Sequence, residues 1–360
     1  MSTPDVSSWN AYYFLALAGI ACMLSGIITL CLRRWASRLG LVDIPNERSS
    51  HRIPTPRGGG LAFVFVALAM TATAFCLLGI YVTPGMWALL AGSLIVSAVS
   101  LTDDLKRIPI LVRFCAHAAG ALILIAGGGW IHEVEIPSGA VLSLGALGLP
   151  LTFIWVVGLT NAYNFMDGID GLAAGHAIVA STTIAWLAHL RGADTVGLTM
   201  VIMGGAVLGF LLHNWPPAKI FMGDVGSAFL GFTFAGWAVL TSSVYSKPLP
   251  FLAWALVMAP FILDTVVTLV SRIVRRKRWY EAHCEHLYQR LNRLGWSHKT
   301  VTCLYLAITA LLGLAIILFY GYQKITSSVF IGMITFPLAG ILLIVSMVEA
   351  SSNQQHTHKH

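Results

Sequence analysis

The chain has 360 residues, of which 57% are hydrophobic and 10% charged, and its formal net charge is +7. Soluble domains carry roughly 25% charged residues, so the composition excludes an ordinary soluble domain and indicates a protein whose solvent is mostly lipid. The six cysteines stand singly without a C-x-x-C pair, which argues against a disulfide framework or a zinc site.

Long apolar segments recur along the chain, and about 20 apolar residues suffice for a helix that spans a bilayer. We predict an all-α integral membrane protein, a polytopic bundle of about eleven transmembrane helices. The expected spans are 11–32, 59–82, 85–101, 110–131, 147–165, 171–190, 195–213, 225–245, 249–272, 300–320 and 328–348. The third and seventh are short or interrupted by glycine, so ten spans remain an alternative. Residues 1–348 form one membrane domain, followed by a short polar tail at 349–360.

Positive charges predict the orientation of these spans, because Lys and Arg gather in cytoplasmic loops. With the N-terminus in the periplasm, all 22 Lys and Arg residues except Arg191, Lys247 and Lys324 fall on the inner side. The positive net charge therefore reflects mostly topology, with a share left for anionic substrates, and it does not indicate nucleic-acid binding.

Five aspartates lie at the inner ends of the predicted spans, where a carboxylate is costly and needs a reason. They are Asp103, Asp104, Asp167, Asp170 and Asp224. Two of them belong to the stretch NAYNFMDGIDGL at 161–172, which also carries Asn161 and Asn164 at a spacing of three. One acid at a wet helix end would need no explanation, but five acids beside Gly-rich turns predict a functional site.

The residue types around these acids favour phosphate chemistry. Carboxylate oxygens suit Mg²⁺, which proteins bind through one or two carboxylates together with substrate phosphates. Glycines in DGIDG and FMGDVGS let the backbone approach a ligand closely. The inner loops also supply basic residues for phosphate oxygens: His51, Arg52, Arg57, Lys106, Arg107 and Lys219. Acids for a metal and bases for phosphate together indicate phosphoryl or phosphosugar transfer.

Four stretches resemble the polyprenyl-phosphate N-acetylhexosamine-1-phosphate transferases, and they occur in the family order. They are SSHRIPTPRGGGLAF (49–63), LTDDLKRI (101–108), NAYNFMDGIDGLA (161–173) and PPAKIFMGDVGSAFLG (216–231). The resemblance implies transfer of an N-acetylated sugar-1-phosphate from a UDP-sugar to undecaprenyl phosphate, with release of UMP. It also implies a Mg²⁺ cofactor, with Mn²⁺ as a substitute, and it allows a homodimer by analogy.

The resemblance assigns roles to individual residues. It implies Asp224 and Asn164 as metal ligands and Asp103, Asp104, Asp167, Asp170 and His286 as catalytic residues. It implies His51, Arg57, Asn161, Lys219, His283 and Arg290 as substrate-binding residues. A role of Asp103 as a base would add little, because the second pKa of a phosphate monoester is near 6 and the lipid phosphate is mostly ionised at pH 7. We therefore rank positioning and charge neutralisation above proton abstraction. A covalent aspartyl-phosphate route is the alternative to direct transfer, and the sequence does not choose between them.

The last large inner loop, 273–299, departs from the family pattern. Many relatives carry H-x-H-H before an Arg-bearing segment, whereas this chain reads HLYQR at 286–290. Only His286 remains, and His283, one helical turn earlier, is expected to share its role. The departure points away from the peptidoglycan branch and toward glycan-initiating enzymes that use GlcNAc, FucNAc, QuiNAc or a similar sugar.

Other ionisable residues lie inside the predicted spans. Asp264 follows Pro260, where we expect a helix break, and a structural polar contact between helices is slightly favoured over a place in the site. His117 and His176 are interpreted as packing residues. An ion-coupled secondary transporter is the alternative function, although its acids would be expected near the midplane and in inverted repeats. We expect the enzyme in the bacterial inner membrane, at the first membrane step of O-antigen or related surface-glycan synthesis.

Overall fold

The computed structural model describes residues 11–45, 53–243, 249–278 and 283–357. Apart from two pairs of very short strands, the elements in these residues are helical. The helices are α1 (Ala11–Leu39), α2 (Gly60–Leu77), α3 (Pro84–Lys106), α4 (Ile110–Ala126), α5 (Gly148–Phe165), α6 (Leu172–Arg191), α7 (Asp194–Asn214), α8 (Asp224–Ser243), α9 (Phe251–Val257), α10 (Ala259–Val274), α11 (Leu287–Arg293), α12 (His298–Ile316) and α13 (Ser327–Thr357). Two single-turn helices, η2 (Gly145–Leu147) and η3 (Ile317–Gly321), precede α5 and continue α12.

The expected all-α membrane architecture is confirmed. Within the described residues, nine helices are long and apolar enough to cross a membrane. Helices α9 and α10 pass the same test as a pair bent by 69°, beside Pro260 as expected, and α4 is apolar but only 17 residues long. Each of the eleven predicted spans thus corresponds to one helix or to the bent pair, and the protein is an all-α polytopic membrane protein.

Several helices extend beyond the predicted apolar segments. Helix α1 continues to Leu39 through three arginines, α3 continues to Lys106, and α13 continues to Thr357 through most of the segment assigned to the polar tail. A helix satisfies its own backbone hydrogen bonds, so it need not end where the apolar residues end. One consequence is that Asp103 and Asp104 lie in the last turn of α3 rather than in a loop.

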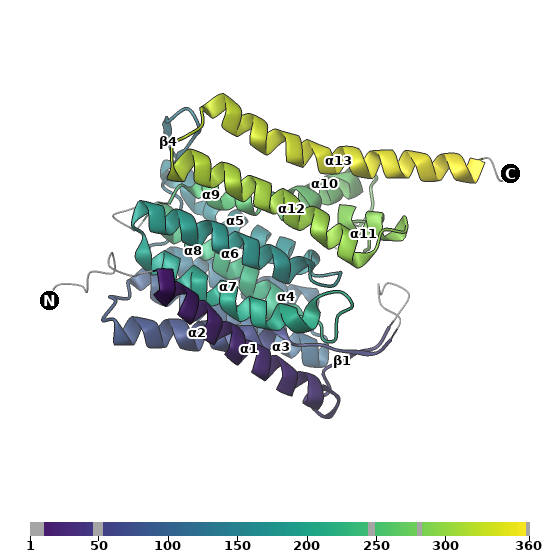
Figure 1. The fold of residues 1–360 in the computed structure, drawn as a ribbon, viewed down its shortest axis with the longest axis horizontal. Helices are drawn as coiled ribbons and strands as arrows, with labels where there is room; N and C mark the ends of the chain where they lie inside the picture. Colours follow the sequence, from purple (N-terminus) through teal and green to yellow (C-terminus); the bar gives the residue numbers. More distant parts are fainter. Residues whose placement is uncertain (1–10, 46–52, 244–248, 279–282, 358–360) are drawn as a thin grey trace.

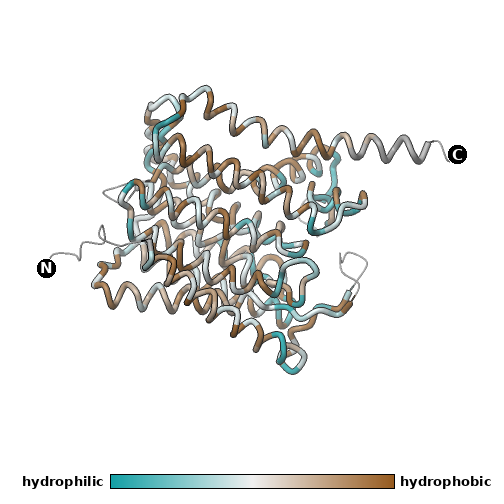
Figure 2. Tube along the Cα trace, viewed as in Figure 1, coloured by the Kyte–Doolittle hydropathy of each residue, from teal (hydrophilic) through white to brown (hydrophobic). Residues whose placement is uncertain are grey.

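The helices run side by side, with the polar connections at the two ends of the bundle (Figures 1 and 2). Strands β3 (Glu133–Glu135) and β4 (Val141–Ser143) pair antiparallel at one end. Helix α11 and the antiparallel pair of β1 (Val42–Asp43) and β2 (Thr55–Pro56) lie at the opposite end. The latter is the end that the positive charges assign to the cytoplasm.

Helix α8 lies at the centre of the bundle, and its side chains are almost wholly buried. It packs against α3 and α5, while α7 packs closely against α1. Small residues permit these approaches: a methyl group at Gly209 would collide with the Cys22 carbonyl of α1. This packing fixes the inner end of α8, where Asp224 begins the helix, between the inner ends of α3 and α5.

Candidate active site

The site is built around the first residues of α8. Both carboxylate oxygens of Asp104 accept backbone N–H groups of this helix, Oδ1 from Asp224 and Oδ2 from Val225, each at 3.1 Å. The preceding Gly223 has a φ of +78°, and a methyl group there would lie 2.7 Å from Asp104 Oδ2. Asp104 is 3% exposed. This carboxylate therefore satisfies the free N–H groups at the start of α8 and holds Asp224 in place.

A guanidinium joins two of the predicted acids. Arg113 Nη1, from α4, lies 2.9 Å from Asp103 Oδ2 and 2.9 Å from Asp224 Oδ2. The two oxygens are therefore no further apart than twice that distance, so a single cation can contact both. Asp103 Oδ1 also accepts the Ile108 N–H at 2.6 Å. In the sequence, Arg113 is only one of the many positive charges that predict the orientation. Its place at the inner end of the span after LTDDLKRI is the signal that could have identified it.

Asn164 and Asp167 face the same acids. Asn164 Nδ2 donates to Ser227 Oγ at 3.1 Å, and its amide lies beside the Asp224 carboxylate. Asp167 lies in the turn after α5. Burial raises the pKa of Asp167 well above its usual value, and the neighbouring carboxylates, Asp224 first, raise it further. The structure thus brings five of the predicted residues together in one acidic cluster: Asp103, Asp104, Asn164, Asp167 and Asp224.

Asn161 and Asp170 make hydrogen bonds outside this cluster, although Asp170 still lies close enough to raise the pKa of Asp167. Asn161 Nδ2 donates to the Val157 carbonyl of its own helix at 2.7 Å. Asp170 Oδ2 accepts the Ala218 N–H at 2.9 Å, and its Oδ1 lies 3.3 Å from His298 Nδ1. The spacing of three does not continue as one helical face, because α5 ends at Phe165 and the chain turns. Asp170 instead ties the turn to the loop before α8 and to α12.

The basic residues of the two Gly-rich loops differ in their positions. Arg57 Nη2 donates to the Asp104 backbone carbonyl, while its Nε is buried without a hydrogen-bond partner in the described residues. The two loops are joined by backbone bonds, from Gly59 N–H to the Phe221 carbonyl and from Gly60 N–H to the Met222 carbonyl. Lys219 is exposed on the loop before α8. His51 lies outside the described residues.

The loop that contains α11 closes over the Asn164–Asp167 turn. His286 is 4% exposed, and its Nδ1 lies 3.0 Å from the Asp264 carboxylate. Tyr288, at a position where many relatives have His, donates its hydroxyl to the Phe165 carbonyl at 2.9 Å. Arg290 lies half-buried on α11. The loop therefore contacts the site through Tyr288.

His283 lies beside His286, as expected, but for a different reason. The expectation assumed a helix over 283–286, whereas α11 begins at Leu287. The two rings are still 5.0 Å apart. Burial, followed by His286 and Arg272, lowers the pKa of His283 to about 4, so its ring is neutral at pH 7.

The interpretation of the residues inside the spans agrees with the structure. Asp264 of α10 is a buried polar contact between helices, since its carboxylate accepts the Tyr305 hydroxyl of α12. His176 is 0% exposed, and its ring nitrogens lie 3.1 Å from the Tyr163 hydroxyl and from the Val257 carbonyl. His117 is buried in α4.

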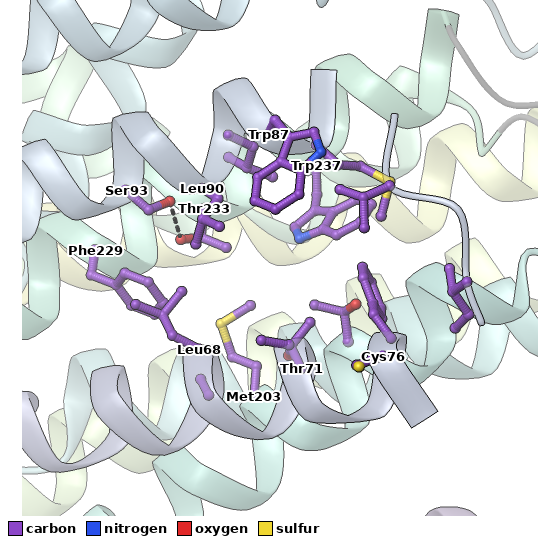
Figure 3. A pocket seen from close by; sticks show the side chains of 18 residues that line it. Leu68, Thr71, Cys76, Trp87, Leu90, Ser93, Met203, Phe229, Thr233 and Trp237 are labelled. Carbon is purple, nitrogen blue, oxygen red and sulfur yellow. Dashed lines mark hydrogen bonds between the residues drawn. The ribbon is translucent and has the colours of Figure 1, made fainter. Parts of the chain in front are cut away.

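A cavity of about 340 Å³ lies apart from the acids, between α2, α3, α7 and α8 (Figure 3). Apolar side chains such as Leu68, Trp87 and Trp237 line it, and its hydroxyls include the Ser93–Thr233 pair at 3.5 Å. None of the residues that line it is charged.

Comparisons with known proteins identify the family. The model of glycosyl transferase family 4 matches residues 86–242. A probable undecaprenyl-phosphate N-acetylglucosaminyl 1-phosphate transferase of Bacillus subtilis is 33% identical over 78% of each chain. The decaprenyl-phosphate N-acetylglucosaminephosphotransferase of Mycobacterium tuberculosis is 32% identical over 93% of this chain and 89% of its own. A phospho-N-acetylmuramoyl-pentapeptide-transferase of Staphylococcus aureus is 27% identical over 84% of this chain and 96% of its own. The chain therefore belongs to the polyprenyl-phosphate N-acetylhexosamine-1-phosphate transferase superfamily of glycosyl transferase family 4.

Proposed function

We propose that this membrane enzyme transfers an N-acetylhexosamine-1-phosphate from a UDP-sugar to undecaprenyl phosphate, at the cytoplasmic side of a bacterial inner membrane. The observation that carries the proposal is the pair of carboxylates, Asp103 and Asp224, that share Arg113 beside Asn164 and Asp167. The names of the Bacillus and Mycobacterium relatives favour GlcNAc as the first sugar to test. The product would begin an O-antigen or another surface glycan.

The reaction exchanges one phosphorus–oxygen bond for another. An oxygen of the lipid phosphate attacks the β-phosphorus of the UDP-sugar, and the bond from that phosphorus to the bridging oxygen breaks. UMP leaves with the bridging oxygen and its electron pair, and the product is an undecaprenyl-diphosphate sugar. Because the lipid phosphate is mostly ionised at pH 7, the protein need not remove a proton first. Positioning the two charged reactants together is the main task.

The residues at the site fit a bound Mg²⁺, with Mn²⁺ as a substitute. Asp103 and Asp224 already share one cation, Arg113, and the Asn164 side-chain amide lies beside Asp224. No group of three His, Cys, Asp or Glu in the described ranges could hold a metal alone. Mg²⁺ in proteins usually binds one or two carboxylates, and water and substrate phosphates complete its coordination shell. When bound, the ion would neutralise the diphosphate charge in the transition state.

The other residues of the site hold and orient the reactants. Asp104 fixes Asp224 through the backbone of α8, and Arg113 keeps two carboxylates at one place. The Arg57 Nε that lacks a partner in the described residues supports a role in phosphate binding. We assign the nucleotide-sugar to the side of α11, where His283 and Arg290 lie.

The test is UMP release by the purified protein with undecaprenyl phosphate and a panel of UDP-sugars that includes GlcNAc, GalNAc, FucNAc, QuiNAc and MurNAc-pentapeptide. We expect release that requires the lipid, stops with a chelator and is absent from folded Asp224→Ala protein. Release that is independent of the lipid or of Asp224 would overturn the proposal. The transporter alternative gains no support, because the relatives above are transferases by name and the acids gather at helix ends.

A further inference from the structure

Asp264 is a fully buried carboxylate that has no part in the reaction as proposed above. It lies in α10 with 0% exposure and accepts hydrogen bonds from the Leu287 N–H at 2.9 Å and the Tyr288 N–H at 3.1 Å. It also lies 3.0 Å from His286 Nδ1 and 2.6 Å from the Tyr305 hydroxyl of α12. A buried charge is tolerated only when such partners surround it. Three of these four partners belong to the start of α11.

The segment that Asp264 holds reaches the site through Tyr288. The Tyr288 side chain is 0% exposed, and its hydroxyl donates to the Phe165 carbonyl at 2.9 Å. A methyl group at Gly168 would collide with the same hydroxyl. Phe165 directly follows Asn164, and Gly168 directly follows Asp167. Tyr288 therefore contacts the turn directly after each of its two site residues, at Phe165 and at Gly168.

We infer that Asp264 is a positioning residue, which holds the start of α11 so that Tyr288 braces the Asn164–Asp167 turn in its reactive geometry. The inference rests on the proposed function, because it deepens the role of the same turn. Asp264 acts only through α11 and Tyr288 and does not touch the substrates. Its loss is therefore expected to lower kcat and to leave the KM for the lipid unchanged, because misplacement of reacting groups is felt in the transition state.

Three single variants distinguish the positioning role of Asp264 from a general contribution to the stability of the fold. Tyr288→Phe removes only the bracing hydroxyl, and we expect kcat to fall about tenfold, the equivalent of one hydrogen bond. Asp264→Asn keeps the side-chain shape but turns an amide toward the N–H groups of α11, and we expect about a hundredfold fall. Tyr305→Phe removes a different donor from the same carboxylate while leaving its bonds to α11. It should lower thermal stability but change kcat less than about twofold.

The double variant Asp264→Asn/Tyr288→Phe tests whether both residues act through one contact. We expect it to be no slower than Asp264→Asn alone, because coupled residues are not additive. A product of the two single effects, about a thousandfold, would overturn the inference.

Hydrogen exchange of the segment 164–171 decides the inference without any assay of transfer. Faster exchange in Asp264→Asn and Tyr288→Phe, with wild-type exchange in Tyr305→Phe, is the expected result. Unchanged exchange of this segment in Asp264→Asn and Tyr288→Phe would overturn the inference, even if the rate of transfer fell. Absence of transfer in the wild-type protein would instead count against the proposed function. The exchange data would still show whether Asp264 and Tyr288 hold the turn.

Discussion

Replacing Asp104 with Asn tests whether this acid acts through the start of α8. The wild-type carboxylate accepts two backbone N–H groups, from Asp224 and Val225 at 3.1 Å each, and it is 3% exposed. Asparagine offers one oxygen to one N–H and turns its own amide hydrogens toward the other. The variant therefore loses at least one hydrogen bond to a charged group and leaves one buried N–H unsatisfied.

The size of the effect follows from these contacts. A hydrogen bond to a charged group contributes about 1.5–3 kcal/mol, and an unsatisfied buried donor costs a similar amount. We expect a loss of about 2–4 kcal/mol in the free energy of unfolding, which a membrane bundle of this size should survive. A displaced Asp224 should lower kcat by about a hundredfold, since a shift of roughly 1 Å at a reacting group has effects of that order.

The assay compares thermal unfolding in detergent and UMP release for Asp104→Asn and for its neighbour Asp103→Asn. The side-chain amide oxygen introduced by Asp103→Asn can still accept the Ile108 N–H, and the ion pair with Arg113 that is lost is partly exposed. Asp103→Asn should therefore cost less than about 1 kcal/mol of stability while it also loses activity. Wild-type stability in Asp104→Asn together with lost activity would refute the reasoning, because Asp104 would then act on the substrates directly.

Two further predictions follow from the charges around the site. Arg113→Gln removes the cation shared by Asp103 and Asp224, so Mn²⁺ should bind several-fold more tightly and the KM for the UDP-sugar should rise. Mn²⁺ binding is measured by electron paramagnetic resonance, and unchanged or weaker binding would contradict the shared site. The pKa of His283 is lowered to about 4, so its ring stays neutral from pH 6 to 8 and His283→Gln should leave the shape of the pH–rate profile unchanged over that range. An inflection near pH 6.5 that disappears in this variant would show that the ring titrates.

The spans could be predicted from sequence because the bilayer fixes both their length and their polarity. The eleven apolar segments each match a helix or the bent pair, and Pro260 marked the bend. The ends were predicted less well. Helix α1 continues through its arginines to Leu39 and α13 to Thr357, because polar residues can extend a helix whose hydrophobic pattern has ended.

The site was predicted in part, since residue type and spacing carry chemistry but not contacts across the bundle. Asp103, Asp104, Asn164, Asp167 and Asp224 do come together. Asp170 had the same spacing and sequence context as Asp167, and only the packing of α12 and the loop before α8 gives it different contacts.

The contacts that the sequence does not reveal join distant segments. Arg113 is one of many inner charges until α4 packs against α3 and α8. Asp264 lies more than twenty residues before the three donors that it holds in α11 and its approach. Tyr288 replaces a family histidine and contacts a turn more than a hundred residues earlier. A single sequence gives no local signal for such pairs.

The most direct test of the account is to follow the β-phosphorus of UDP-GlcNAc during the reaction. With undecaprenyl phosphate, Mg²⁺ and substrate labelled at the β-phosphate, the account predicts that the label enters the organic phase with the lipid while unlabelled UMP appears in equal amount. Folded Asp224→Ala protein should transfer no label. Label that stays in water as UDP while the sugar alone joins the lipid would contradict the claim that this enzyme transfers a sugar-1-phosphate.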